Sequence, residues 1–236
     1  MALTAANILQ RASDIIQDQT NVRWPEAELL RYLNDGRREI AIIRPDLYAK
    51  TDVVTLAAGT KQSLPSDGSR FLDAVRNMSG TSPNFTAGRA VRIVEREILD
   101  AQRPDWHADT QTATIQHFMF DERNPRIFYV YPPALNTAKL EIVYSQTPTE
   151  ITASSTELTN EDIYAGALVD YVVYRAFSKD SEYAGNAQRA VMHYQQFANS
   201  LGVGRKLSFT SSPNTANVGG MPPRQAVAEV TAPAQS

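Results

Sequence analysis

A histidine and an aspartate lie two positions apart in the segment WHAD and are the first candidates for chemistry. Asp109 could orient the imidazole of His107 for proton transfer, or the two side chains could share a metal ion. Neither His117 nor His193 lies at the spacing of a second metal ligand. A polar loop therefore explains the pair better, and a hydrolase or metal enzyme built on it is the lesser hypothesis.

Two carboxylates and two arginines lie between aromatic runs in FMFDERNPRIFYVYPP, residues 118–133. Asp121 and Glu122 are adjacent, so on an extended chain their side chains point apart and do not share a substrate. Aspartate, asparagine and Pro125 favour a turn. The stretch therefore predicts a β-hairpin with DERNP as its loop, and its second strand should end at the two prolines 132–133 because proline cannot donate to a ladder.

The aromatic residues of this stretch have two interpretations. On a sheet surface they could stack nucleic-acid bases, but such a platform needs interleaved basic residues, and only Arg123 and Arg126 flank it. The core of a sheet is the better interpretation, and a nucleic-acid-binding module remains the alternative function. The residues concerned are Phe118, Phe120, Phe128, Tyr129 and Tyr131.

Other catalytic signatures are missing from the sequence. The segment GTKQSLP leads into a strand and is no phosphate-binding loop, and neither a dinucleotide fingerprint nor a nucleophile elbow is present. The absence of cysteine excludes disulfides, thiolate zinc sites and cysteine nucleophiles. We therefore predict no catalytic residue, no metal and no cofactor, and a protein that is not an enzyme.

Composition narrows the classes of partner. The chain of 236 residues has 42% hydrophobic and 21% charged residues and a net charge of −3, which argues against a broad basic face for nucleic acid. The N-terminus is amphipathic and unlike a signal peptide. No apolar run approaches the roughly 20 residues of a membrane-spanning helix, so no membrane partner is expected.

The first 50 residues predict two helices. Thr4 can cap a helix whose apolar stripe is Ile8, Leu9, Ala12, Ile15 and Ile16. A second helix should begin at Pro25 and stop before Arg44 and Pro45, because a residue that precedes proline is pushed out of helical geometry. Gly36 within it either allows close packing or is merely tolerated.

Residues 51–151 change to the period of β-strands. Strands are expected in DVVTLAAGTKQSLP, RAVRIV, IQHFMF, RIFYVYP and KLEIVYSQTP, while RFLDAVRNM is ambiguous and EREILDAQ looks helical. Gly59 can adopt the positive φ of a turn.

Helical periodicity returns after residue 151. Thr159 with Asp162 resembles a capping box, and a short polar break separates two antiparallel helices, the second ending at Gly202. The predicted buried faces are Ile163, Ala167, Val169, Val172, Val173 and Phe177 in the first helix, and Ala187, Ala190, Val191, Tyr194 and Phe197 in the second.

The segment from Gly204 is rich in Pro, Gly, Ser, Thr and Ala and cannot bury enough apolar surface to order itself. Its start, RKLSF, alternates apolar and polar residues and could add as a strand to the sheet of another subunit. A solvated terminus is an equal alternative. The candidate partner-binding residues are Arg205, Lys206, Leu207 and Phe209.

These patterns predict an α+β fold by segregation. Residues 1–50 and 152–203 supply the helices of one bundle, residues 51–151 form an inserted β-rich domain, and residues 204–236 form an extended tail. Such a molecule fits a structural protein that assembles through protein interfaces.

The order of these motifs resembles a known family. WPEAELLRYLNDGRREIAIIRPDLY, LAAGTKQSLP with FLDAVRNM, FDERNPRIFYVYPP and a late helical pair together resemble the head-to-tail adaptors of short-tailed phages. These adaptors are similar to tail tubular protein A of T7-like phages. The resemblance covers residues 7–201 and rests on the order and character of the segments.

The resemblance implies a structural virion protein. Such adaptors form a ring, typically of twelve copies, between the portal and the tail nozzle, and the ring is part of the DNA ejection channel. The expected partners are other copies of the chain, the portal protein, the nozzle protein and the genome, which passes without sequence-specific binding. The expected locations are the virion neck and, during assembly, the host cytoplasm.

Overall fold

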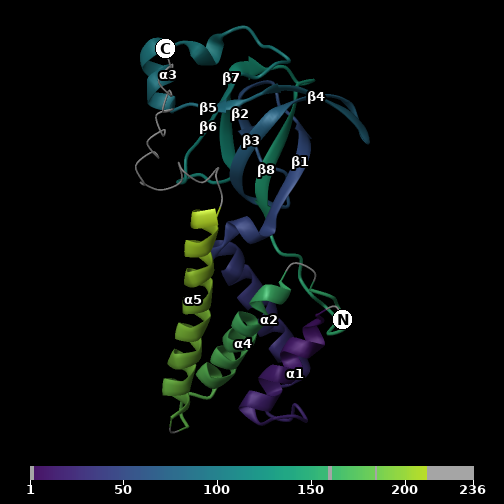
Figure 1. Ribbon diagram of the computed structural model, residues 1–236, viewed down its shortest axis with the longest axis vertical. Helices are drawn as coiled ribbons and strands as arrows, with labels where there is room; N and C mark the ends of the chain where they lie inside the picture. The colour runs from purple at the N-terminus through teal and green to yellow at the C-terminus, as the bar shows by residue number, and fades with distance from the viewer. Residues whose placement is uncertain (1–2, 159–160, 184, 212–236) are drawn as a thin grey trace, which may run out of the picture.

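The computed structural model describes residues 3–158, 161–183 and 185–211. In this part of the chain it contains five α-helices and two four-stranded sheets, which confirms the predicted α+β class. Figure 1 shows α1, α2, α4 and α5 gathered at one end of the long axis, and the sheets with α3 at the other. The N- and C-terminal regions thus supply the helices, and the β-strands come between them.

Helices α1, Ala5–Ile16, and α2, Glu26–Ile43, begin and end close to the predicted positions. Thr4 caps α1 through a capping box with Asn7. The predicted apolar stripe of α1 is buried except for Ile15, which is 45% exposed. Helix α2 stops before Arg44, as the proline after it requires.

Close packing explains Gly36. A Cβ atom built there would lie 2.9 Å from Cδ1 of Tyr171 on the facing helix. The missing side chain lets the aromatic ring lie directly against the backbone of α2. Of the two explanations that the sequence left open, close approach is therefore the one that the structure supports.

Helices α4, Ala165–Lys179, and α5, Asn186–Ser211, form the predicted antiparallel pair. A short 3₁₀ turn, Asp162–Tyr164, precedes α4, and Ile163 within that turn is exposed rather than buried as predicted. Helix α4 is central in the bundle because α1, α2 and α5 all pack against it.

The predicted helix end at Gly202 is wrong, because α5 continues to Ser211. One glycine costs a helix about 1 kcal/mol, which does not stop it when the residues beyond remain helical. Residues 204–211, predicted as the start of an extended tail, are the last turns of α5, and the strand that residues 205–209 could add to another subunit stays a prediction. Residues 212–236 of the predicted tail, and Thr159 of the predicted capping box, lie outside the described residues.

The first sheet has the strand order β1-β8-β3-β4, all antiparallel. Its strands are β1, Ala49–Thr55, β3, Gly68–Thr81, β4, Asn84–Ala90, and β8, Lys139–Gln146. The ambiguous segment RFLDAVRNM is thus part of the long strand β3.

The second sheet has the order β2-β7-β6-β5. Its strands are β2, Gly59–Ser63, β5, Arg92–Ile93, β6, His117–Phe120, and β7, Ile127–Ala134, and only the β5–β6 pair is parallel. Helix α3, Arg96–Gln102, and the 3₁₀ turns Pro45–Tyr48 and Trp106–Ala108 complete the elements.

The predicted end of β7 at its two prolines is wrong. The strand continues through Pro132 and Pro133 to Ala134, because a proline carbonyl oxygen can still accept a hydrogen bond there. The backbone N–H of Thr112 donates to the carbonyl oxygen of Pro133 at 2.8 Å, and proline lacks only the donor.

Two main cores hold these layers together. One lies among the helices and includes the fully buried Leu33, Leu168 and Val172. The other lies between the two sheets and includes Phe71 and Phe128, which stack with ring centroids 4.5 Å apart. A third, small cluster forms around Trp106 beside the second sheet.

Candidate functional site

The stretch of mixed charges between β6 and β7 is a turn, as predicted. The Asp121 carboxylate accepts the backbone N–H of Arg123 at 2.9 Å, and the N–H of Asn124 donates to the Asp121 carbonyl at 3.0 Å. Glu122 instead forms an exposed ion pair with Arg70 at 2.8 Å. The two carboxylates therefore serve different structural contacts and share no site.

His107 and Asp109 are not brought together as a catalytic pair. Nδ1 of His107 lies 2.8 Å from the hydroxyl of Thr60, and its ring stacks on Trp106. Asp109 instead accepts hydrogen bonds from Arg103 and from the hydroxyl of Tyr131, each at 3.2 Å. These contacts fix the loop before β6 to the second sheet, which agrees with the polar-loop interpretation.

The other histidines also have structural surroundings. His117 stacks on Tyr131 across the β6–β7 pair, at a centroid distance of 6.3 Å. His193 of α5 lies with Nδ1 2.8 Å from a carboxylate oxygen of Asp170 on α4, and its ring stacks on Phe177. The contacts of His193 with Asp170 and Phe177 hold α5 against α4.

The aromatic residues of the hairpin form core, as the better of the two interpretations predicted. Phe118 and Phe128 are 3% and 0% exposed and pack on Phe71. Tyr129 and Tyr131 turn to the other face of the sheet and meet the edge of Trp106. Phe118 and Phe128 are therefore out of reach of bases, while Phe120, Tyr129 and Tyr131 are only partly buried.

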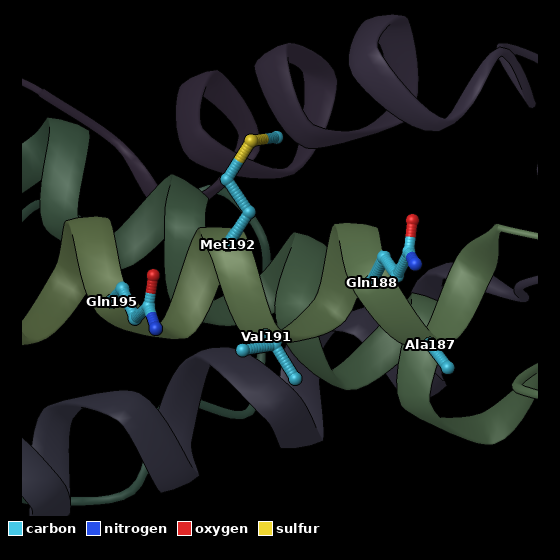
Figure 2. A pocket seen from close by; sticks show the side chains of 5 residues that line it. All are labelled: Ala187, Gln188, Val191, Met192 and Gln195. Carbon is cyan, nitrogen blue, oxygen red and sulfur yellow. The ribbon is translucent and has the colours of Figure 1, made fainter.

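An exposed apolar surface lies on α5. Five residues of this helix line a shallow hollow, and together we call them the α5 outer face: Ala187, Gln188, Val191, Met192 and Gln195. Figure 2 shows these five side chains along one stretch of the helix, with Met192 at its upper edge and Val191 at its lower edge in this view. Val191 is 57% exposed and Met192 is 47% exposed.

The sequence prediction for α5 was wrong on this point. Ala187, Val191 and Tyr194 were expected in the buried stripe, and the structure places all three at the surface. Ala190 and Phe197 are buried as predicted, and Leu201, which the prediction lacked, is buried as well. The sequence did contain a sign of an uncharged surface on this helix. Arg189 is the only Lys, Arg, Asp or Glu among residues 186–202.

A buried polar cluster joins α2 to the segment that returns from the sheets. The guanidinium of Arg37 donates from Nε to both carboxylate oxygens of Glu161, at 2.9 and 2.8 Å, and from Nη1 to the Thr149 carbonyl. Tyr48 also donates to Glu161, and burial with this hydrogen bond raises the pKa of the Tyr48 hydroxyl.

Asn34 completes this junction. Its side-chain amide donates to the carbonyl of Ile151 and accepts the backbone N–H of the same residue, both at 2.9 Å. Sequence reasoning missed the junction because its partners lie more than 100 positions apart.

The predicted partner-binding residues Arg205, Lys206, Leu207 and Phe209 lie in the last turns of α5. Figure 1 shows that this end of the helix points toward the sheets. The structure describes only the backbone there, so the role of the four side chains stays a prediction.

Comparison with family models identifies the family of this chain. The model described as SU10 adaptor protein matches residues 3–218, which is nearly the whole chain. The chain belongs to the SU10 adaptor protein family. It is therefore a phage adaptor, a structural class of protein, and the predicted resemblance to phage adaptors is confirmed at this level.

The adaptor has no match among curated proteins. Within residues 3–158, 161–183 and 185–211 it has no cluster of three or more His, Cys, Asp or Glu side chains that could hold a metal ion. In the same residues, no helix has the length and apolar character to cross a membrane. The narrower likeness to tail tubular protein A remains a prediction.

Proposed function

We propose that this adaptor forms a ring between the portal and the tail nozzle of a phage, and that the ring encloses part of the DNA ejection channel. The observation that carries the proposal is the match to the adaptor family over residues 3–218. Copies of the chain, twelve by the resemblance, stand side by side, and the genome passes without sequence-specific contacts. The protein resides in the virion neck and, before assembly, in the host cytoplasm.

The architecture supports this role. The helices and the sheets have separate cores, and they lie at opposite ends of a long axis. A ring subunit of this shape can present one end to the portal and the other to the nozzle. The net charge of −3 also suits a channel, because cations along its wall would hold the DNA phosphates.

We further propose that the C-terminal segment docks on the portal. The candidate contacts are Arg205, Lys206, Leu207 and Phe209, at the end of α5, with the residues that follow them. In the division of the chain that we propose, residues 204–236 act as the docking segment, and residues 1–50 with 152–203 act as the supporting bundle.

Deletion of residues 205–236 tests the docking segment. Phe197 and Leu201 are the last core residues of α5 among the side chains that the structure describes, so the shortened chain should fold and lose only the helical signal of residues 205–211. Its co-sedimentation with the portal of the same genome should be lost, while the full chain should bind. A shortened chain that still binds the portal fully would show that the segment is not the docking element.

A further inference from the structure

The α5 outer face has the composition of a protein interface. A surface helix of a monomer normally turns charged residues to solvent. Here the five residues of the hollow, Ala187, Gln188, Val191, Met192 and Gln195, carry no ionisable group, and the two largest apolar ones are about half exposed. Tyr194 beside them is 40% exposed.

The packing of α5 leaves this face open. Helix α4 is the main partner of α5 in the described part of the chain, and the contacts run through Tyr171 with Phe197 and through Tyr174 with Tyr194. A helix of 26 residues is thus attached along one side. Its outer side has the length and shape to receive another helix, at the usual interaxial distance of about 8–10 Å.

A second neutral surface lies across the bundle on α1. We name the α1 outer face as the exposed residues Ala6, Gln10, Arg11, Asp14 and Ile15. The charges of Arg11 and Asp14 cancel, and Ile15 is an apolar side chain exposed to 45%. Figure 1 shows α1 and α5 on opposite sides of α4.

We propose that the α5 outer face of one adaptor copy packs against the α1 outer face of the next copy. This inference rests on the proposed ring, and it names the surfaces that build it. A contact between two different patches on opposite sides of a subunit is heterologous and closes into a ring when the rotation allows.

Charge favours a second copy as the occupant. Identical copies carry the same net charge of −3, which gives a weak overall repulsion between them. Two faces without net charge add nothing to that repulsion, and Val191, Met192 and Ile15 supply apolar area to bury.

The chain has no cysteine, so introduced cysteines give crosslinks without background. The test variant carries Gln10→Cys and Gln195→Cys in one chain, and it is treated with a short bismaleimide both bound to the portal and free at high concentration. The proposal predicts a ladder of trimers and higher multimers on a denaturing gel. A mixture of the two single variants should stop at dimers, and each single variant alone should stay monomeric.

Other products would overturn the inference. Dimers of Gln195→Cys alone would mean that α5 meets α5 in a two-fold contact, and a product of this variant with the portal protein would assign the face to the portal. Portal-bound adaptor without any ladder would also overturn it. If the wild-type chain fails to bind the portal, the proposed function fails, and the ladder in the free protein then decides the inference separately.

A charge introduced on the α5 outer face provides a second test. Val191→Glu should abolish the multimers and leave the thermal midpoint within a few degrees, because the residue is exposed. The matched control is Ile93→Glu on β5, which is 59% exposed and lies far from the bundle. Multimers of Val191→Glu equal to those of wild type would contradict the assignment.

Discussion

At the scale of single residues, the side chains that could do chemistry are used for structure. His107 is bound to Thr60, and His193 pins α5 to α4 through Asp170. The strongest polar contacts are those of Arg37 and Glu161, whose side chains are 10% and 7% exposed. Buried charge here joins segments that are distant in sequence, so its loss should lower the stability of the fold.

Replacement of Arg37 by leucine tests this junction. Glu161 would keep a buried charge without its main partner, which costs about 3–5 kcal/mol in folding free energy. Urea unfolding followed by circular dichroism measures the loss. The control is Arg38→Leu, whose ion pairs are about half exposed and contribute less than about 1 kcal/mol. Equal midpoints for both variants would show that the junction is dispensable.

Asp18 gives a prediction about pH. Its carboxylate accepts the backbone N–H groups of Trp24, Val22 and Arg23 at 2.9 to 3.0 Å, and these bonds hold the Asp18 pKa below its ordinary value of 3.8. A carboxylate with a lowered pKa stabilises the fold above its unfolded-state pKa, and this stabilisation is lost as the pH falls through the lowered value.

Asp18→Asn should therefore lower the urea midpoint at pH 7 and flatten its decline between about pH 4 and pH 2. Unfolding curves at several pH values measure both effects. Glu122→Gln, in an exposed turn, serves as the control and should change the midpoint little. A variant whose curve against pH runs parallel to that of the wild type would refute the role of Asp18.

At the scale of elements, the contact of α2 with α4 depends on a glycine. Gly36→Ala would place a Cβ atom 2.9 Å from Tyr171, and overpacking of this kind costs about 1–3 kcal/mol. Gly166→Ala is the control, because nothing lies within 4 Å of its Cβ position on α4 and alanine favours the helix by about 0.5–1 kcal/mol. Thermal unfolding should move in opposite directions for the two variants.

The order of elements follows from local sequence. Thr4 and Pro45 mark helix boundaries, and the alternation of residues 127–131 marks a strand, because caps, proline and side-chain period act over a few positions. The failures are tertiary. Val191 looked buried by period, but which side of a helix faces the core depends on its neighbours, and α4 takes the Phe197 side.

The remaining surprises have the same origin. Pro133 stays within β7 because Thr112, from a distant loop, supplies the donor. Glu161, the main partner of Arg37, follows the inserted strands in the sequence, and no pattern in the sequence links the two residues. Local rules thus predicted most of the elements, whereas the contacts between elements were visible only in the structure.

At the scale of the whole molecule, the proposed function depends on contacts between neighbouring copies. The chain offers an exposed face on α5, a second neutral face on α1 and the C-terminal segment that we propose to dock on the portal. These three features suit a protein that is held between neighbours and between two larger assemblies. A monomer in isolation agrees with this account, because the portal can serve as the template on which the ring forms.

The most direct test is the mass of the complex. Purified adaptor is mixed with the portal ring of the same genome, and multi-angle light scattering gives the mass of the peak while negative-stain images give its symmetry. The account predicts a stacked ring whose added mass is an integral number of 26.1 kDa chains, twelve if the resemblance holds to that level. A portal that elutes at its own mass, with the adaptor left as a separate monomer, would contradict the central claim.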